Sequence, residues 1–229
     1  EKGIFTTCKK TDKCPPWQFE AKKITHDKNK KTIFYKDALL KIYDVPVLYF
    51  PKFFHPDPTV KRQSGFLPPT FISSNSTGGA FILPYFKAIS NSKDLTLSPR
   101  LYSKNQILLQ TEYRSVDAKS TQLIDFSFLN QKKLSSKTHF FSNTITNLDL
   151  NNFDQSIITL QLQHSSNDTY LKKYKLKSPL INNPDTLTSS LGFTAIRDDL
   201  IMETEFLMYE TLNKKKSSDK YEYIYPSYK

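Results

Sequence analysis

Apolar and polar residues alternate with a period of two along most of this chain, and almost no segment spaces its apolar residues as a helical face does. Residues 107–114 show the pattern, with Ile107 and Leu109 on one side and Leu108 and Gln110 on the other. The same alternation recurs at the ranges 123–128, 158–163 and 201–208. Because successive side chains of a strand point to opposite faces of a sheet, the sequence predicts an all-β protein.

A proline-rich bend, PKFFHPDPTVKR at residues 51–62, divides the chain into two parts. Before the bend the expected strands are short and separated by polar turns. After it the alternating segments reach roughly ten residues, the length that a tilted strand needs to cross a bilayer in a barrel. We therefore expect one domain at residues 1–62 and a second at residues 63–229.

The connections between the expected strands of the second domain alternate in length. Residues 165–185 form a long connection, whereas residues 197–199 form a short one. Outer-membrane barrels have long outer loops and short periplasmic turns, so the asymmetry favours such a barrel. A soluble sandwich also has one apolar and one polar face, so alternation alone leaves both architectures open. The longest apolar run, residues 45–51, is too short for a membrane-spanning helix.

The net charge of +11 favours an anionic partner, which could be a nucleic acid, a membrane surface or an acidic lipid. Lysines that only solvate the surface are the simpler explanation of the same charge. The chain has 5 glycines and lacks GxxxxGK[ST] and GxGxxG, so phosphate-binding glycine loops are excluded.

Residues for catalysis are scattered. The four histidines lie in separate segments, no GxSxG or HExxH motif occurs, and the paired glutamates of one expected strand should form a solvated barrel wall. These residues are His26, His55, His139, His164, Glu203 and Glu205. We therefore expect no enzyme activity, no catalytic residue, no cofactor and no metal site.

The two cysteines, Cys8 and Cys14, lie near an N-terminus that lacks a signal peptide, so we expect the start to be processed or internal. No histidine stands at a zinc-ligand spacing from them, which argues against a metal. A disulfide in an oxidising compartment is favoured, with free thiols as the alternative.

Several unusual strings stand in one order along residues 4–116: FTTC, WQFEAKKITHD, VPVLYFP, RQSGFLPPTF and LPYF, then TEYR. In these strings and their order the chain resembles the LptD family (also called OstA or Imp), which assembles lipopolysaccharide at the outer membrane. Residues 117–229 resemble the family only in their alternation.

The resemblance implies the end of a periplasmic β-jellyroll followed by the first antiparallel strands of a transmembrane β-barrel. The implied partners are lipopolysaccharide, the lipoprotein LptE as a barrel plug and an LptA-type bridge protein, with no nucleic acid. It places the barrel in the outer membrane and the N-terminal part in the periplasm. It also implies a disulfide at the FTTC cysteine. The chain is much shorter than the family, so we expect a partial barrel.

Two prolines, Pro69 and Pro84, match the positions of the prolines of the family's lateral gate and are expected in the first and second barrel strands. A proline in a strand donates no hydrogen bond to its neighbour, which weakens the pairing there. An ordinary edge-strand proline is the alternative, and it is the reading we adopt for Pro68 and Pro99.

The resemblance also implies a jellyroll groove for the acyl chains of lipid A, for which one apolar face of successive strands is needed. A closed β core would fit the same pattern. The residues expected to line the groove are Trp17, Phe19, Ala21, Ile33, Tyr35, Leu40, Ile42, Val47 and Tyr49.

Two other functions fit part of the sequence. A soluble, basic, all-β nucleic-acid module explains the charge and the aromatics, but not the ten-residue strands. A general porin explains the second domain and leaves the first unexplained. Solubility without detergent would favour the nucleic-acid module, and conductance in a planar bilayer would favour the porin.

Overall fold

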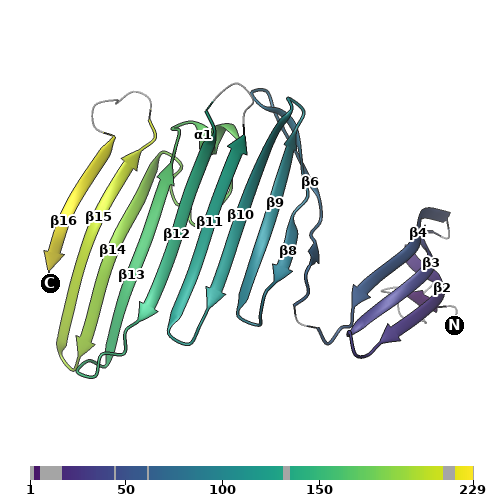
Figure 1. Cartoon of the computed structure of the whole chain (residues 1–229), viewed down its shortest axis with the longest axis horizontal. Coiled ribbons are helices and arrows are strands. Elements are labelled where there is room, and N and C mark those ends of the chain that lie inside the picture. The colour runs from purple at the N-terminus through teal and green to yellow at the C-terminus, as the bar shows by residue number, and fades with distance from the viewer. Residues whose placement is uncertain are drawn as a thin grey trace. The chain divides into compact units, whose positions relative to one another are not determined.

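The computed structural model describes residues 3–5, 17–43, 45–60, 62–130, 135–213 and 220–228. These residues form β-strands in antiparallel sheets and one four-residue helix, so the prediction of an all-β protein is confirmed (Figure 1). The chain divides into two compact units, Glu1–Gln63 (unit 1) and Ser64–Lys229 (unit 2). Within the described ranges, no helix is long and apolar enough to cross a membrane.

Unit 1 is a four-stranded antiparallel sheet in chain order. Its strands are β1 (Gly3–Phe5), β2 (Trp17–Asp27), β3 (Thr32–Ile42) and β4 (Val45–Pro56). Asp27 closes the β2–β3 turn, because its Oδ1 accepts hydrogen bonds of 3.0 Å from the backbone N–H groups of Asn29 and Lys30.

In the middle of the unit 1 strands, the regular two-residue spacing of the buried side chains is interrupted. Ala21 and Ala38 are fully buried and pair with each other, yet their cluster continues at Ile24 and Tyr35, three residues further along each strand. Residues on one face of a regular strand are two apart. Asp37 between them has a positive φ of 51°, and this local twist turns the following residues over.

Unit 2 is one antiparallel sheet of twelve described strand segments (Figure 1). Ten of them follow each other as neighbours in the order β6, β7 and then β9 to β16, while β8 also pairs with β9, and β5 pairs with β8. The first four are short: β5 (Gly65–Phe66), β6 (Thr70–Ser74), β7 (Gly78–Ile82) and β8 (Tyr85–Ala88). The others are β9 (Lys93–Tyr102), β10 (Gln106–Val116), β11 (Ser120–Asn130), β12 (Lys137–Asn147), β13 (Gln155–Ser165), β14 (Thr186–Arg197), β15 (Leu200–Thr211) and β16 (Tyr221–Tyr228).

The two faces of the unit 2 sheet differ in what covers them. Ile107 and Leu109 are 59% and 41% exposed, whereas Leu108 between them is fully buried. Across the register Leu108 pairs with Leu129, which is also fully buried, while Leu109 pairs with the exposed Phe128. We call the side of Leu108 the inner face and the side of Ile107 the outer face. The outer face is apolar and uncovered.

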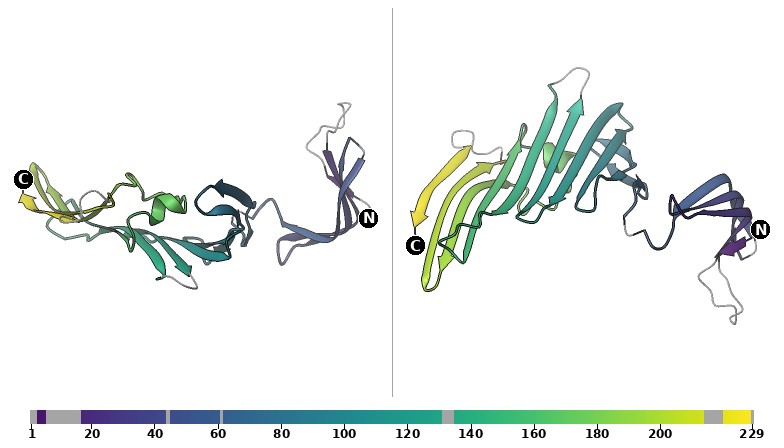
Figure 2. Two further views of the ribbon diagram at one scale, coloured as in Figure 1. Left: turned by 90° about the horizontal axis from the view of Figure 1, so that it is seen from above. Right: turned by 60° about the horizontal axis from the view of Figure 1, so that its bottom comes forward.

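Part of the inner face is covered by the connection between β13 and β14. This connection, residues 166–185, contains the short helix α1 (Tyr170–Lys173) and lies on the concave side of the sheet (Figure 2). Tyr170, Leu171 and Tyr174 are buried against the strands. They form one apolar cluster with side chains of the sheet, among them Tyr102, Leu108, Leu129, Phe141 and Leu187. The long connection is therefore packed structure and not a free loop.

Candidate functional site

The hydrogen-bonded ladder of unit 2 is interrupted in its first hairpin. β6 pairs with β7, beginning at Thr70 opposite Ile82, and β5 pairs with β8, with Phe66 opposite Tyr85. The residue numbers of opposed partners add up to 152 in the first pairing and to 151 in the second, so the register slips by one residue between them. The first two strands of the sheet are thus each broken into two segments.

Prolines stand at both interruptions. Pro69 lies between β5 and β6, and Pro84 lies between β7 and β8. We expected them inside the first two strands, but they lie in the gaps between paired segments, because a proline has no N–H group to donate to a neighbouring strand. Across the gap the Leu67 N–H donates to the Pro84 carbonyl at 2.8 Å, and the Leu83 N–H donates to the Pro99 carbonyl at a longer 3.3 Å.

A cavity of about 300 Å³ lies on the inner face at this level of the sheet. Pro84 and Ile82 of the second strand form part of its wall, and Lys175 and Lys177 of the 166–185 connection form another part. Arg100 and Glu112 also line it, so its formal charges are three positive and one negative. The interruption therefore borders a cavity whose charged side chains are mostly positive.

Buried polar side chains fix the 166–185 connection to the inner face. The Arg100 guanidinium donates to the backbone carbonyls of Tyr174 and Lys175 at 3.3 and 3.4 Å, and to the side-chain oxygen of Gln110. Gln110 Nε2 in turn donates to both oxygens of Asp125 at 3.0 Å and to the Lys177 carbonyl at 2.9 Å. Charged hydrogen bonds of this kind are costly to break once they are buried.

Asp125 also belongs to a row of side chains that the sequence motifs did not reveal. His139 Nε2 lies 3.3 Å from Asp125 Oδ1, and His139 Nδ1 lies 2.5 Å from the hydroxyl of Ser127. These residue types form the triad of serine hydrolases. Here all three are at most 1% exposed, and the Tyr170 hydroxyl occupies the Ser127 oxygen at 2.8 Å. A substrate cannot reach Ser127, so the row anchors α1.

Burial raises the pKa of Tyr170 to about 12. Its hydroxyl therefore remains neutral at physiological pH and keeps its hydrogen bond with Ser127. The contact between α1 and the sheet is thus independent of Tyr170 ionisation near pH 7.

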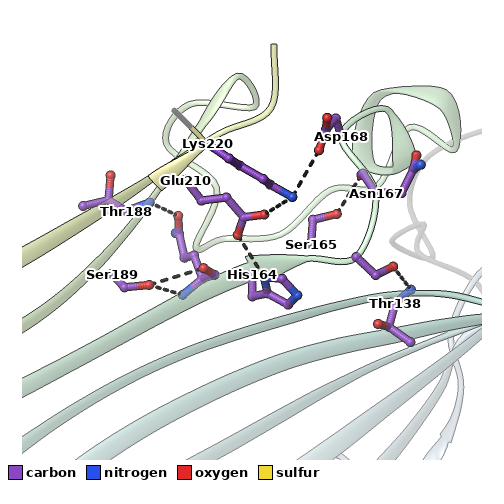
Figure 3. Close-up of polar contacts among 11 residues, drawn as sticks. Thr138, His164, Ser165, Asn167, Asp168, Thr188, Ser189, Glu210 and Lys220 are labelled. Carbon is purple, nitrogen blue, oxygen red and sulfur yellow. Dashed lines mark hydrogen bonds and ion pairs between the residues drawn. The ribbon is translucent and has the colours of Figure 1, made fainter. Parts of the chain in front are cut away.

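A second group of contacts holds the start of the connection (Figure 3). Lys220 directly precedes β16, and its Nζ lies 3.3 Å from Asp168 Oδ1 and 3.0 Å from Glu210 Oε1. Glu210 also contacts His164 Nδ1 at 2.9 Å. Glu210 is 1% exposed, so its charge is compensated by these partners in a buried position. The connection is therefore fastened both to the middle of the sheet and to its C-terminal strands.

In unit 1 the structure brings together most residues expected to line the groove. The rings of Phe19 and Tyr35 meet edge to face at 5.4 Å, and Phe53 joins them at 5.1 and 5.7 Å. Trp17 and His55 complete a small pocket of about 210 Å³ with these three rings. The Tyr35 hydroxyl contacts His55 Nε2 at 2.7 Å, and burial raises the Tyr35 pKa. We call this side of the sheet the aromatic face.

Leu40 pairs with Phe19, Ile42 pairs with Trp17, and Ala21 and Ile33 belong to the same cluster, so these four also lie on the aromatic face. Tyr49 is different, because it pairs with Leu39, the neighbour of Leu40 on β3, and its side chain points to the other side of the sheet. There the Tyr49 hydroxyl donates to Asp37 Oδ1 at 2.7 Å. Val47 lies at the register shift between β3 and β4 and has no partner in the register. Lipid binding by the aromatic face stays a prediction.

The described residues contain no group of three or more His, Cys, Asp or Glu side chains that could hold a metal ion. Cys8 and Cys14 lie outside the described residues, so their predicted disulfide stays a prediction. The sequence offered one signal for the buried network: Gln110 and Asp125 stand on the polar sides of their strands. It offered none for their contact with residues 166–185.

Comparisons with known proteins give a consistent result. A family model described as LptD protein matches residues 33–177. The curated LPS-assembly protein LptD of Legionella pneumophila (strain Paris) is 35% identical over 133 residues, which are 58% of this chain and 16% of that protein. The protein of the same name from Pseudoalteromonas translucida (strain TAC 125) is 35% identical over 127 residues, 56% of this chain and 17% of that protein. The Pseudomonas aeruginosa (strain UCBPP-PA14) protein is 36% identical over 96 residues, 42% of this chain and 10% of that protein. The chain thus spans about one sixth of the first two relatives.

Proposed function

Because this chain belongs to the LptD family, we propose that it guides lipopolysaccharide from a periplasmic groove in unit 1 to a lateral opening in unit 2. Unit 1 is then the end of a jellyroll, and unit 2 holds the first strands of an outer-membrane barrel. The uncovered apolar outer face of unit 2 supports the barrel assignment, since lipid-facing positions of a barrel strand alternate with polar inward ones.

The observation that carries this proposal is the proline-broken first hairpin. A barrel that only conducts solutes through its lumen benefits from continuous ladders, because an unpaired backbone group in lipid costs several kcal/mol. A barrel that releases a lipid sideways needs a seam that separates. The interruptions at Pro69 and Pro84 provide such a seam, and the cavity behind them is suited to a polar, anionic headgroup. This favours lipopolysaccharide transport over a general porin.

The acyl chains would follow the aromatic face of unit 1, where Phe19, Tyr35 and Phe53 offer apolar rings. In the complete protein we expect LptE to plug the barrel and an LptA-type bridge protein to deliver the lipid to the jellyroll. The role is transport and not catalysis, in keeping with the burial of Ser127 and His139.

Site-specific photo-crosslinking in the full-length protein tests the route at both ends. A photo-crosslinking residue at Ile42, on the aromatic face, should trap lipopolysaccharide, whereas one at Lys41 on the opposite side of β3 should not. In unit 2, Ile82 lines the cavity at the interruption and should also label. Asn143, which lies on the inner face of β12, is the matched control. Equal labelling of test and control positions would contradict the route.

A further inference from the structure

The side of unit 1 opposite to the aromatic face carries a row of lysines. Lys23 of β2 pairs directly with Lys36 of β3, and Lys36 pairs directly with Lys52 of β4. All three side chains are exposed. In the described part of the chain, no acidic side chain lies within ion-pair distance of these three. Like charges directly opposite each other destabilise a sheet, so the fold gains nothing from this row.

Aromatic side chains stand next to the lysines on the same side. Two residues further along each strand, Thr25 pairs with Phe34 and Phe34 pairs with Phe54. Phe34 and Phe54 are 39% and 61% exposed, and their ring centroids lie 6.0 Å apart. A groove of about 470 Å³ is lined by these residues and the three lysines, together with Tyr35 and Phe53, whose rings pack on the aromatic face. We call this side, formed by Lys23, Thr25, Phe34, Lys36, Lys52 and Phe54, the lysine face.

The position of the lysine face within unit 1 is also informative. It lies toward the end of the sheet where β4 finishes at Pro56 and the chain continues to unit 2. The β2–β3 turn at that end adds Lys28, Lys30 and Lys31. At the opposite end, by contrast, Lys41 is neutralised by Glu20 at 2.5 Å. Six lysines therefore stand at the Pro56 end of the sheet with the two carboxylates Asp27 and Asp57, which leaves a positive balance of charge where the chain continues to unit 2.

We propose that the lysine face binds the headgroup layer of an anionic phospholipid membrane, with Phe34 and Phe54 entering the interface. Lysines next to exposed aromatic rings are the composition of surfaces that lie on a bilayer, since the cations attract lipid phosphates while the rings enter the headgroup region. Lipopolysaccharide on the aromatic face is on the other side of the sheet and is not the ligand here. The inference rests on the proposed function in one respect, that unit 2 spans the membrane.

Adjacent residues Phe53 and Phe54 give a matched test, because they have the same side chain and point to opposite faces. A photo-crosslinking phenylalanine derivative is placed at either position in the full-length protein in cells, and the adducts are identified by mass spectrometry. Position 54 should yield phospholipid adducts and position 53 should yield lipopolysaccharide adducts. Phospholipid adducts of equal yield at both positions, or lipopolysaccharide as the main adduct at position 54, would overturn the inference.

Charge is tested by the triple variant K23Q/K36Q/K52Q. If each lysine attracts anionic lipid, phospholipid adducts at position 54 should fall by roughly fivefold or more. The variant K23R/K36R/K52R keeps the charges and should retain the adducts, which separates charge from misfolding. Unchanged phospholipid adducts in the glutamine variant would overturn the inference.

The two positions also separate this inference from the proposed function. Lipopolysaccharide adducts at position 53 without phospholipid adducts at position 54 would overturn the lysine-face inference and leave the transport route intact. Phospholipid adducts at position 54 without lipopolysaccharide adducts at position 53 would support the lysine face and contradict the route.

Discussion

The first hairpin of unit 2 and the pair β10–β11 are built from the same kind of alternating sequence but differ in their ladders. β10 and β11 pair without interruption from Ile107 opposite Asn130 to Val116 opposite Thr121. The first hairpin pairs over two short stretches, with a one-residue slip between them. Prolines stand at the slip in the hairpin, whereas neither β10 nor β11 contains one. The two regions share one fold and differ in the backbone donors that Pro69 and Pro84 lack, and we propose that this difference allows the first hairpin to open.

The largest effect is expected when a proline is placed in the uninterrupted ladder of β10. In Thr111→Pro, a donor is removed from the middle of the β10 ladder, where Thr111 pairs with Leu97 and Phe126. The partner carbonyl would be left unpaired at membrane depth, which costs several kcal/mol. We expect the yield of folded barrel, measured by heat-modifiable electrophoretic mobility, to fall sharply.

Leu83→Pro is the matched control, because it removes only the long 3.3 Å hydrogen bond at the existing break. Its folded yield should stay near that of the unmodified protein. If the two variants lose folded protein equally, the first hairpin and the β10–β11 pair do not differ in how much they depend on backbone hydrogen bonds.

A smaller but clear effect is expected from the buried network. Asp125→Ala removes the acceptor of two Gln110 hydrogen bonds and the partner of His139. Loss of charged hydrogen bonds at a fully buried position should lower the free energy of unfolding by about 3 kcal/mol. It should also make residues 166–185 more sensitive to limited proteolysis.

Asp117→Ala is the control for this change, because Asp117 is 54% exposed and forms a surface ion pair of 3.4 Å with Lys93. Such pairs contribute about 0–1 kcal/mol. Equal proteolysis of the two variants would show that the network does not hold the connection.

The smallest effect concerns the turn after β4. Asp57 accepts hydrogen bonds from the Thr59 N–H and hydroxyl, and these contacts, with nearby His26, lower the Asp57 pKa. A lowered pKa means that the contribution to stability is present above the ordinary pKa of aspartate and is lost as pH falls through the folded value. Hydrogen-exchange protection of the Thr59 amide should therefore decrease on acidification in that range. In Asp57→Asn the protection should not depend on this titration; the same acid loss in that variant would contradict the assignment.

The sequence predicted the two faces of unit 2 well because period-two alternation leaves little freedom. Once Ile107 faces outward, Leu108 must face inward. The same rule could not place Tyr49, since alternation does not say which residues of β4 share a face of the sheet with Phe19 and Tyr35. That choice depends on the positive φ of Asp37 and on the register shift near Leu40, neither of which alternation encodes.

The buried network could not be predicted for a different reason. Arg100, Gln110, Asp125 and His139 come from four successive strands, and only the register brings them together. The connection that covers them has no periodic pattern, so its packing on the inner face left no trace in the hydrophobic spacing. Pro69 and Pro84 could be located because each is a local signal, whereas the slip between them is a property of the pairing.

The central claim is that missing donors in the first hairpin allow lipopolysaccharide to leave sideways. The double variant P69A/P84A restores two backbone donors, each worth about 0.5–1.5 kcal/mol when paired. The control is Pro179→Ala, which removes a proline from the 166–185 connection and leaves the ladder unchanged.

The decisive measurement is the appearance of lipopolysaccharide in the outer leaflet of cells carrying these variants in the full-length protein, normalised to the amount of folded barrel. The account predicts that P69A/P84A folds and inserts but delivers less lipopolysaccharide per folded protein, while Pro179→Ala delivers the normal amount. Unchanged normalised delivery by P69A/P84A would mean that Pro69 and Pro84 only mark the edge of the sheet, and the lateral opening would have to be sought elsewhere.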